Sequence, residues 1–196
     1  MAHCIALTKG RELDCSRISG GVRYLYFGVY DQYLTPIETA GIVQAAGTVT
    51  DINMESASVI YRYAMPLGAA SVTETITGST ENGTIFYTPT VNLVMNKLTA
   101  ADQNEIRLLG QTKVVIFAQL NEIIPANQHN TIIALGVTNG MALNTGTMDT
   151  GAGFGDRNGY TLTFDGLEPN PFPFVADYTT DPFDNAGFSD FTVDID

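Results

Sequence analysis

The stretch "GAGFGDRNGYTLTF", residues 151–164, decides between two fold classes. Its first glycines are spaced G-A-G-F-G, which differs from the G-x-G-x-x-G spacing of dinucleotide-binding loops. Such loops lead into a helix whose N-terminus holds the pyrophosphate, whereas Tyr160, Leu162 and Phe164 alternate with polar residues, as in a half-buried strand. The stretch therefore argues against a nucleotide site and predicts a glycine-rich connection that ends in an Asn158-Gly159 hairpin turn.

Strand patterns continue through most of the chain. Aromatic and β-branched residues dominate 22–30, alternation predicts strands over 57–65 and 85–95, and the continuous apolar runs 113–120 and 131–137 predict strands buried on both faces. Pro89 cannot donate a hydrogen bond, so the strand over 85–95 is expected to be bulged or to form a sheet edge there. Three Asn-Gly pairs predict hairpin turns: Asn82-Gly83, Asn139-Gly140 and Asn158-Gly159.

One short helix is predicted over about residues 99–109. Thr99 is suited to the N-cap position, and Asp102 follows three residues later, close to a capping-box arrangement. Gly110 is a natural residue for the end of the helix. The chain is therefore predicted to be mainly β, a β-sandwich or barrel that carries one helix.

The composition limits the partners of the protein. The 196 residues contain 9 Lys and Arg against 21 Asp and Glu, for a formal net charge of −12. Such a charge repels nucleic acid and anionic membranes, although a wall past which DNA slides without sticking stays compatible with it. The sequence has no run of about 18 apolar residues, so no membrane partner is expected.

Two cysteines, Cys4 and Cys15, are interpreted as reduced thiols of a protein made in the cytosol. A disulfide between them, or half of a metal site, stays open as an alternative. No cofactor is expected.

The last part of the chain differs from the rest. Residues 165–196 carry eight acidic and no basic residues, together with four prolines and six aromatic rings. Prolines favour an extended backbone, while the rings have apolar area that water disfavours. We therefore expect a β-rich domain over residues 1–167 and an extended acidic arm over 168–196, whose rings pack on a neighbouring subunit.

Catalytic patterns are weak. His3 and His129 are the only histidines, and neither H-E-x-x-H nor G-x-S-x-G occurs. Asp149 and Asp156 could flank a glycosidic bond or bind calcium, but glycine-rich connections also carry aspartate for turn formation. The protein is therefore not expected to be an enzyme, and a hydrolase is kept only as a remaining alternative.

Three segments carry a resemblance to a known family: "CIALTKGRELDCSRISGGVRYLYFGVYD", "VTETITGSTENGTIFYTPTVNLVMNKLTAADQNEIRLLG" and "GAGFGDRNGYTLTFDGLEPNP". Across most of residues 4–171 the layout resembles structural proteins of tailed bacteriophages, of the tail-tube type. The resemblance implies a virion protein, assembled in the host cytoplasm, whose hexameric rings stack into a conduit for DNA and meet other tail or neck proteins. The alternative is a carbohydrate- or receptor-binding β-sandwich of the virion.

The tail-tube hypothesis assigns candidate roles to individual residues. The hairpin over 73–88 is expected to project from the core and to contribute to a sheet shared by the ring. The candidate subunit-interface residues are Ile76, Ile85, Tyr87, Pro89, Phe172, Phe174 and Phe183. The candidate lumen-lining residues are Glu74, Glu81, Asp149 and Asp165.

Overall fold

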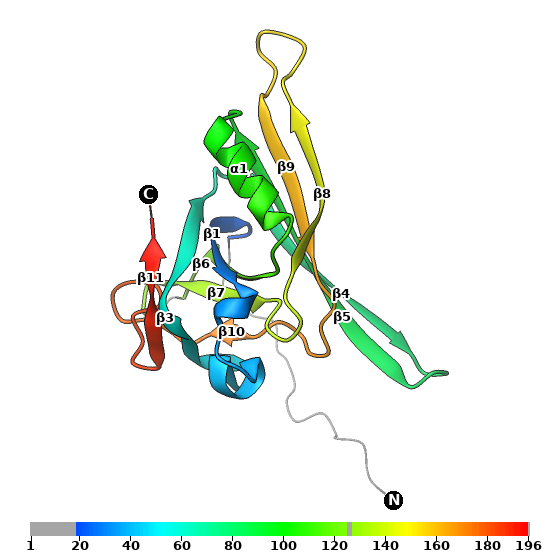
Figure 1. Cartoon of the computed structure of the whole chain (residues 1–196). Coiled ribbons are helices and arrows are strands. Elements are labelled where there is room, and N and C mark those ends of the chain that lie inside the picture. Colours follow the sequence, from blue (N-terminus) through cyan, green and yellow to red (C-terminus); the bar gives the residue numbers. More distant parts are fainter. Residues whose placement is uncertain (1–18, 125–126, 196) are drawn as a thin grey trace, which may run out of the picture.

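The computed structural model describes residues 19–124 and 127–195, so Cys4 and Cys15 lie outside the described residues. The chain is mainly β, as the alternating patterns predict, and its strands form two sheets (Figure 1). In chain order the elements are β1 (Val22–Val29), the 3-10 helix η1 (Tyr30–Gln32), the π-helix η2 (Ile37–Gly41), β2 (Ile42–Ala45), β3 (Thr48–Ala64), β4 (Ala70–Ser79), β5 (Thr84–Asn96), α1 (Ala100–Leu109), β6 (Val114–Ile124), β7 (His129–Leu135), β8 (Ala142–Asp149), β9 (Gly159–Asp165), β10 (Phe174–Val175) and β11 (Phe188–Asp194).

The larger sheet closes into a small barrel. Its strands follow the order β1-β6-β7-β10-β3, and β3 pairs again with β1, so the hydrogen-bonded ladder returns to its start. The length of β3 makes this closure possible, because Thr48 at its beginning pairs with Phe174 of β10 while Ala64 at its end pairs with Tyr24 of β1. Strands β2 and β11 are added along β3.

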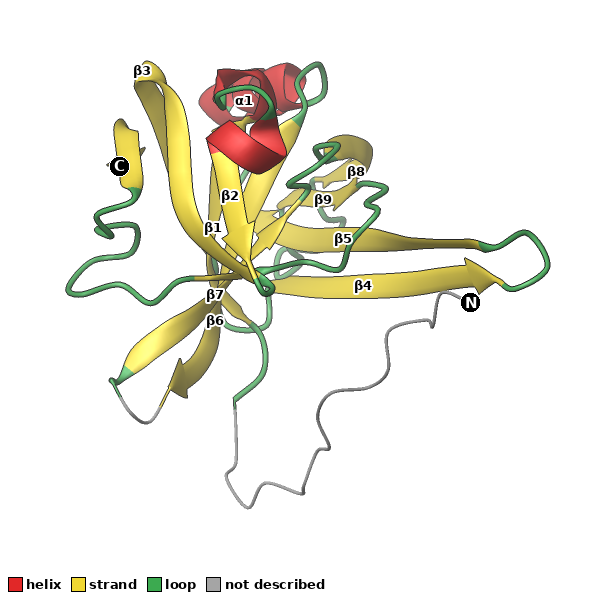
Figure 2. Ribbon diagram, turned by 90° about the horizontal axis from the view of Figure 1, so that it is seen from below, coloured by secondary structure: helices red, strands yellow, loops and turns green. Residues whose placement is uncertain are grey.

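The smaller sheet packs on the barrel and completes a sandwich (Figure 2). It has the antiparallel order β4-β5-β9-β8. Its buried side chains Val91, Leu93, Leu162 and Phe164 meet Phe27 and other apolar residues of the barrel in one cluster. Burial of these side chains removes apolar area from water, the main contribution to the stability of such a fold.

Strand β6 has a different core on each face. Val114 and Ile116 belong to the sandwich core, whereas Val115 and Phe117 belong to the interior of the barrel. Successive side chains of a strand point to opposite faces, so a strand between two cores needs apolar residues at every position. The prediction that residues 113–120 are buried on both faces is confirmed from Val114 to Gln119.

The predicted helix is confirmed as α1. The hydroxyl oxygen of Thr99, the N-cap, accepts a hydrogen bond from the backbone N–H of Asp102 at 3.0 Å. Leu98, Ile106 and Leu109 pack against the sandwich core. α1 thus covers one opening between the two sheets.

The structure does not contain the two-residue hairpin turn expected at Asn158-Gly159. Gly159 is the first residue of β9, and the whole stretch 150–158 connects it to Asp149, the last residue of β8. A Cβ atom on Gly159 would lie 2.0 Å from the carbonyl oxygen of Met95. The glycine therefore permits close approach of β5, while Asn158 accepts the backbone N–H groups of Lys97 and Leu98.

The C-terminal segment folds back on its own chain, which differs from the expected extended arm. β10 lies between β7 and β3, and β11 pairs in parallel with β3. Phe183 is 7% exposed, and its ring centre lies 5.0 Å from that of Tyr26 and 5.2 Å from that of Phe117. Composition indicated that the rings need an apolar groove, but it could not say that the barrel of the same chain supplies it, without the entropy cost of association.

Candidate assembly interface

The β4–β5 hairpin extends the sandwich sheet beyond its core, as Figures 1 and 2 show. Ile76 pairs with Tyr87, and Ile85 lies one step farther out on the same face as the buried Val91. This face is apolar, yet Ile76 is 63% and Ile85 is 58% exposed. The hairpin therefore exposes branched apolar side chains to water. They lie on the same face of the sheet as the side chains that form the core.

Pro89 marks the point where β5 loses one of its two neighbours. Strand β9 pairs with Thr90–Asn96 and ends at Asp165, and the carbonyl oxygen of Pro89 then accepts the N–H of Gly166 at 3.2 Å. Outward from Pro89 the ladder continues with β4, apart from one bridge between Tyr87 and Glu168. The expected bulge or sheet edge is therefore not found at this proline: β5 lies inside the sheet, its ladder with β4 is continuous, and only its pairing with β9 ends here.

Strands β4 and β8 are the two outer strands of the four-stranded sheet. Each offers a row of backbone N–H and C=O groups on the side away from its partner. Neither strand contains Lys, Arg or Pro, the residues with which proteins commonly protect exposed edges from pairing. The sheet thus has two long edges of the kind that pair with other chains.

The face of this sheet that points away from the barrel is rich in hydroxyl groups. Thr73, Thr75 and Thr77 lie on it, opposite to Val72 and Ile76. The four strands contain no Lys or Arg, although Arg157 from the connecting segment bonds the hydroxyl of Thr161. The register places these threonines on the same face: Thr73, Thr75, Thr77, Thr84, Thr88, Thr90, Thr145, Thr147, Thr161 and Thr163.

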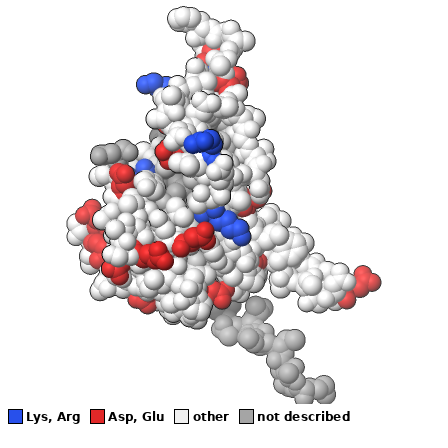
Figure 3. Space-filling model, viewed as in Figure 1, with Lys and Arg blue, Asp and Glu red and all other residues white. Residues whose placement is uncertain are grey.

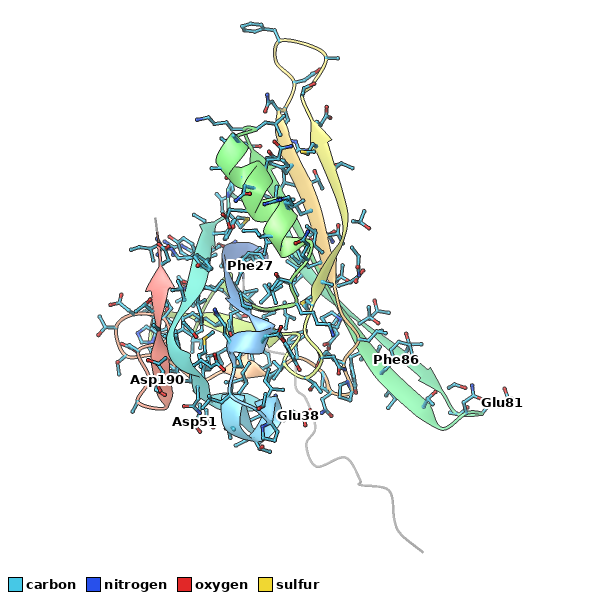
Figure 4. All side chains as sticks on the ribbon, viewed as in Figure 1. Phe27, Glu38, Asp51, Glu81, Phe86 and Asp190 are labelled. Atoms are coloured by element: carbon cyan, nitrogen blue, oxygen red, sulfur yellow. The ribbon has the colours of Figure 1, made fainter. Side chains whose placement is uncertain are left out.

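The four candidate lumen residues do not lie together. Asp149 and Asp165 belong to the threonine-rich face, and the carboxylate of Asp165 is paired with the amide of Asn144. Glu81 lies in the turn at the tip of the β4–β5 hairpin, where Figure 4 labels it, with Phe86 farther back on β5. Glu74 points to the opposite face, because it shares the side of Val72 and Ile76.

Two glutamates fix the segment that follows β9: Glu74 joins it to the smaller sheet, and Glu168 joins it to the turn after β7. Glu74 accepts the backbone N–H of Phe172 at 2.9 Å, and Glu168 accepts those of Thr138 and Asn139, both at 2.9 Å. Burial raises the pKa of both carboxyls above the usual range. The sequence did not single out Glu168, because the residues around it are exposed, with Leu167 at 60%, and nothing local distinguishes this acid from the others.

The three candidate interface phenylalanines of the C-terminal segment lie in different environments. Phe172 packs against the sandwich core, and Phe183 is enclosed in the barrel. Phe174 is 50% exposed and pairs with Thr48 and Ile133 within the barrel ladder. Of these three rings, Phe174 has the most surface for a second chain.

Charge is unevenly spread over the surface. Figure 3 shows acidic side chains gathered near β11 and at the tip of the β4–β5 hairpin. Most of the β4–β5 hairpin and of the hairpin formed by β8 and β9 is uncharged (Figure 3). Within residues 19–124 and 127–195 one ion pair occurs, between His129 Nδ1 and Asp177 Oδ1 at 2.8 Å, and the His129 ring stacks on Tyr178. His129 is the first residue of β7.

No protein-family model, curated protein or solved structure matches the chain. Among the helices described, none has the length and apolar character needed to cross a membrane. The described part of the chain also has no cluster of three His, Cys, Asp or Glu side chains arranged to hold a metal ion.

Proposed function

We propose that the protein is a self-assembling structural protein whose four-stranded sheet joins that of neighbouring copies into a closed ring. The observation that carries the proposal is the sheet itself, which combines two open edges with a threonine-rich outer face whose strands contain no Lys or Arg. Stacked rings would form a tube through which DNA passes. With the resemblance of the sequence to phage tail-tube proteins, this supports a role in a virion tail.

The order of the strands favours head-to-tail pairing. Because every neighbour in β4-β5-β9-β8 is antiparallel, β4 and β8 run in opposite directions. The β4 edge of one copy can therefore pair with the β8 edge of the next and continue the antiparallel ladder. Such a contact joins two different surfaces, and it closes into a ring when the rotation between copies fits.

The chemistry of the outer face suits a lumen. Lys and Arg would bind DNA phosphates and release counterions, which makes retention strong at low salt. Thr hydroxyls carry no charge, and Asp149 and Asp165 add repulsion at this face. A wall of this kind lets DNA slide without holding it.

The apolar side chains of the hairpin supply contact area for the neighbour. Ile76 and Ile85 are exposed on the face opposite to the threonines, so a neighbouring copy can cover them without touching the lumen. Burial of apolar area contributes about 25 cal/mol per Å². Hexameric ring number, contacts with other tail or neck proteins and the virion location follow from the family resemblance and are part of this proposal.

An edge-specific substitution tests the proposal. The N–H of Val94 bonds the carbonyl of Ala69, so by alternation along the ladder the N–H of Ile76 points away from β5. Ile76→Pro removes that outward donor and leaves the hairpin intact, whereas Ile76→Thr keeps the donor and serves as its control.

Negative-stain microscopy of the purified protein gives the result. Wild-type protein should form rings or tubes with a central channel, Ile76→Thr should form fewer of them, and Ile76→Pro should stay folded and form neither. Wild-type protein that stays monomeric at all concentrations and salt conditions, or normal rings from Ile76→Pro, would contradict the proposal. Monomers with affinity for saccharides would favour the receptor-binding alternative.

A further inference from the structure

The loop that joins β8 to β9 presents one aromatic ring entirely to solvent. We call residues 150–158 the Phe154 tip; Phe154 has a relative exposure of 112%. Figure 1 shows this loop at the far end of the β8–β9 hairpin, beyond α1 and away from the barrel. Exposure of a complete phenyl ring costs free energy that burial against a partner would recover.

The Phe154 tip is held in a defined shape by its own aspartates. The carboxylate of Asp156 accepts the backbone N–H groups of Ala152 at 3.0 Å and Gly153 at 2.6 Å. Asp149 accepts the N–H of Gly151 at 2.9 Å. A loop ordered in advance loses little conformational entropy when it binds, so the ring is presented ready for contact, beside two carboxylates.

A second surface of the same chain has the complementary chemistry. The guanidinium carbons of Arg62 and Arg23 lie 4.8 and 5.4 Å from the ring centre of Tyr24. Beside them is a hollow of about 360 Å³, whose lining includes Leu67 and Ile123. Leu67 is 90% and Ile123 is 49% exposed. We call Arg23, Tyr24, Arg62, Leu67 and Ile123 the arginine–tyrosine groove.

The two arginines of this groove lack an acidic partner among the described residues, where the single ion pair joins His129 to Asp177. This is unexpected in a chain with 21 acidic and 9 basic residues. Arginine and tyrosine next to exposed apolar side chains form the composition that dominates protein–protein binding energy. The apolar border also favours a protein segment over a nucleic acid as the occupant.

We propose that the Phe154 tip of one copy docks in the arginine–tyrosine groove of a second copy. The phenyl ring fills the hollow against Leu67 and Ile123, and Arg23 and Arg62 face the acidic tip. Two carboxylates at the tip, Asp149 and Asp156, outnumber its one base, Arg157, so the net charge of the tip is opposite to that of Arg23 and Arg62. The lining of the hollow includes Arg23 and no carboxylate. Because tip and groove are different surfaces of one chain, the contact is head-to-tail and continues from copy to copy.

This contact is separate from the β4 and β8 edges on which the proposed ring depends. It adds a second direction of association between copies. Ile76→Pro blocks the strand edges, and Phe154→Ser removes the phenyl group of the tip. Loss of ring assembly and loss of the tip contact can therefore be observed independently.

Disulfide trapping between two different variants tests the contact directly. Cys4 and Cys15 are first replaced by Ser in full-length protein, and this background receives Phe154→Cys in one preparation and Leu67→Cys in another. Under mild oxidation the mixture should give a covalent pair far faster than either preparation alone. Leu108→Cys on α1, with 45% exposure, replaces Leu67→Cys in the control mixture.

Sedimentation of non-covalent variants gives the second measurement. In the Ile76→Pro background, where the edges cannot pair, Phe154→Ser, and separately Arg23→Glu with Arg62→Glu, should each weaken association by about tenfold or more, as expected for hot-spot residues. A mixture of the two should form pairs that cannot extend, because each pair keeps one intact tip and one intact groove.

The measurements also define what would overturn the inference. It fails if the mixed cysteine variants cross-link no faster than the control, or if adding Phe154→Ser to Ile76→Pro leaves association unchanged. It also fails if the mixture of the Phe154→Ser variant with the Arg23→Glu, Arg62→Glu variant stays monomeric at every concentration tested. Cross-links that persist in the Ile76→Pro background would support the tip contact even where the proposed ring is absent.

Discussion

The carboxylate of Glu168 accepts the backbone N–H of Asn139 at 2.9 Å, in a side chain that is 6% exposed. It holds the turn after β7 against the end of β9, next to the bridge between Glu168 and Tyr87. A carboxylate in this position is paired with N–H dipoles and not with a base, so its protonation state bears on the stability of the fold.

Stability should therefore depend on pH through Glu168. Burial raises the pKa of this carboxyl, against the opposing effect of the N–H donors from Asn139 and Thr138. A group with a raised pKa in the folded state contributes its full stability below its unfolded pKa of about 4.3 and loses it as the pH rises through the folded value. In Glu168→Gln, the free energy of unfolding from urea titrations should fall less between pH 4.5 and 7 than in wild type. Glu81→Gln, in the exposed turn, is the control, and equal pH slopes in all three proteins would contradict the prediction.

Phe183 should be essential for the stability of the monomer. Its ring contacts Tyr26, Phe117, Phe188 and Phe191 in the barrel, so Phe183→Ala should lower the free energy of unfolding by about 3–5 kcal/mol. Phe174→Ala, at a half-exposed site of the same segment, should cost less, and chemical denaturation of both variants measures the difference. Equal small losses would indicate that the C-terminal segment does not pack as described.

Thr99 should contribute to stability as the cap of α1. Thr99→Ala removes the oxygen that accepts the N–H of Asp102, and loss of such a cap costs about 1 kcal/mol. Gln103→Ala, at an exposed position inside the helix, tests whether the loss depends on the cap. The prediction fails if the two substitutions change the free energy of unfolding equally.

Acidic substitutions on the hairpin should prevent assembly without unfolding the subunit. Ile76→Asp combined with Ile85→Asp places two charges on the exposed apolar face, where an assembled neighbour would bury them unpaired. Negative-stain microscopy should show no rings or tubes, and circular dichroism should match wild type. Leu108→Asp on α1 is the control for added charge, and normal tubes from the double variant would refute the role of this face.

Basic substitutions on the threonine-rich face should make the protein retain DNA. Thr75 and Thr88 are directly opposite each other in the β4–β5 register. In Thr75→Lys with Thr88→Lys, assembled tubes should bind double-stranded DNA with an affinity whose logarithm falls with the logarithm of the salt concentration, by about 0.9 for each phosphate contacted. Leu108→Lys should bind less, and wild-type affinity in the double variant would place this face outside the lumen.

Local patterns were sufficient for several elements. The period-two rows of β4 and β5, the double-sided burial of β6 and the Thr99 cap depend on residues within a few positions of one another. These features could be predicted because their causes lie inside one segment.

Other features depend on which segments meet. The turn expected at Asn158-Gly159 is displaced because Gly159 lies against the backbone of β5, more than sixty residues earlier in the chain. The buried Glu168 is set by N–H groups of a turn some thirty residues away. No window of the sequence contains both partners.

The sequence by itself determined the class of the fold, the helix and the alternation that separates the threonine row from the apolar row of the hairpin. Only the tertiary structure decided that the barrel closes through β3, that the aromatic C-terminal segment is buried in its own chain and that Phe154 stands free at a tip. The physical reason is the same in each case. Alternation and capping are set by the geometry of neighbouring residues. Burial depends on which segments, distant in the sequence, pack against an apolar side chain in the folded protein.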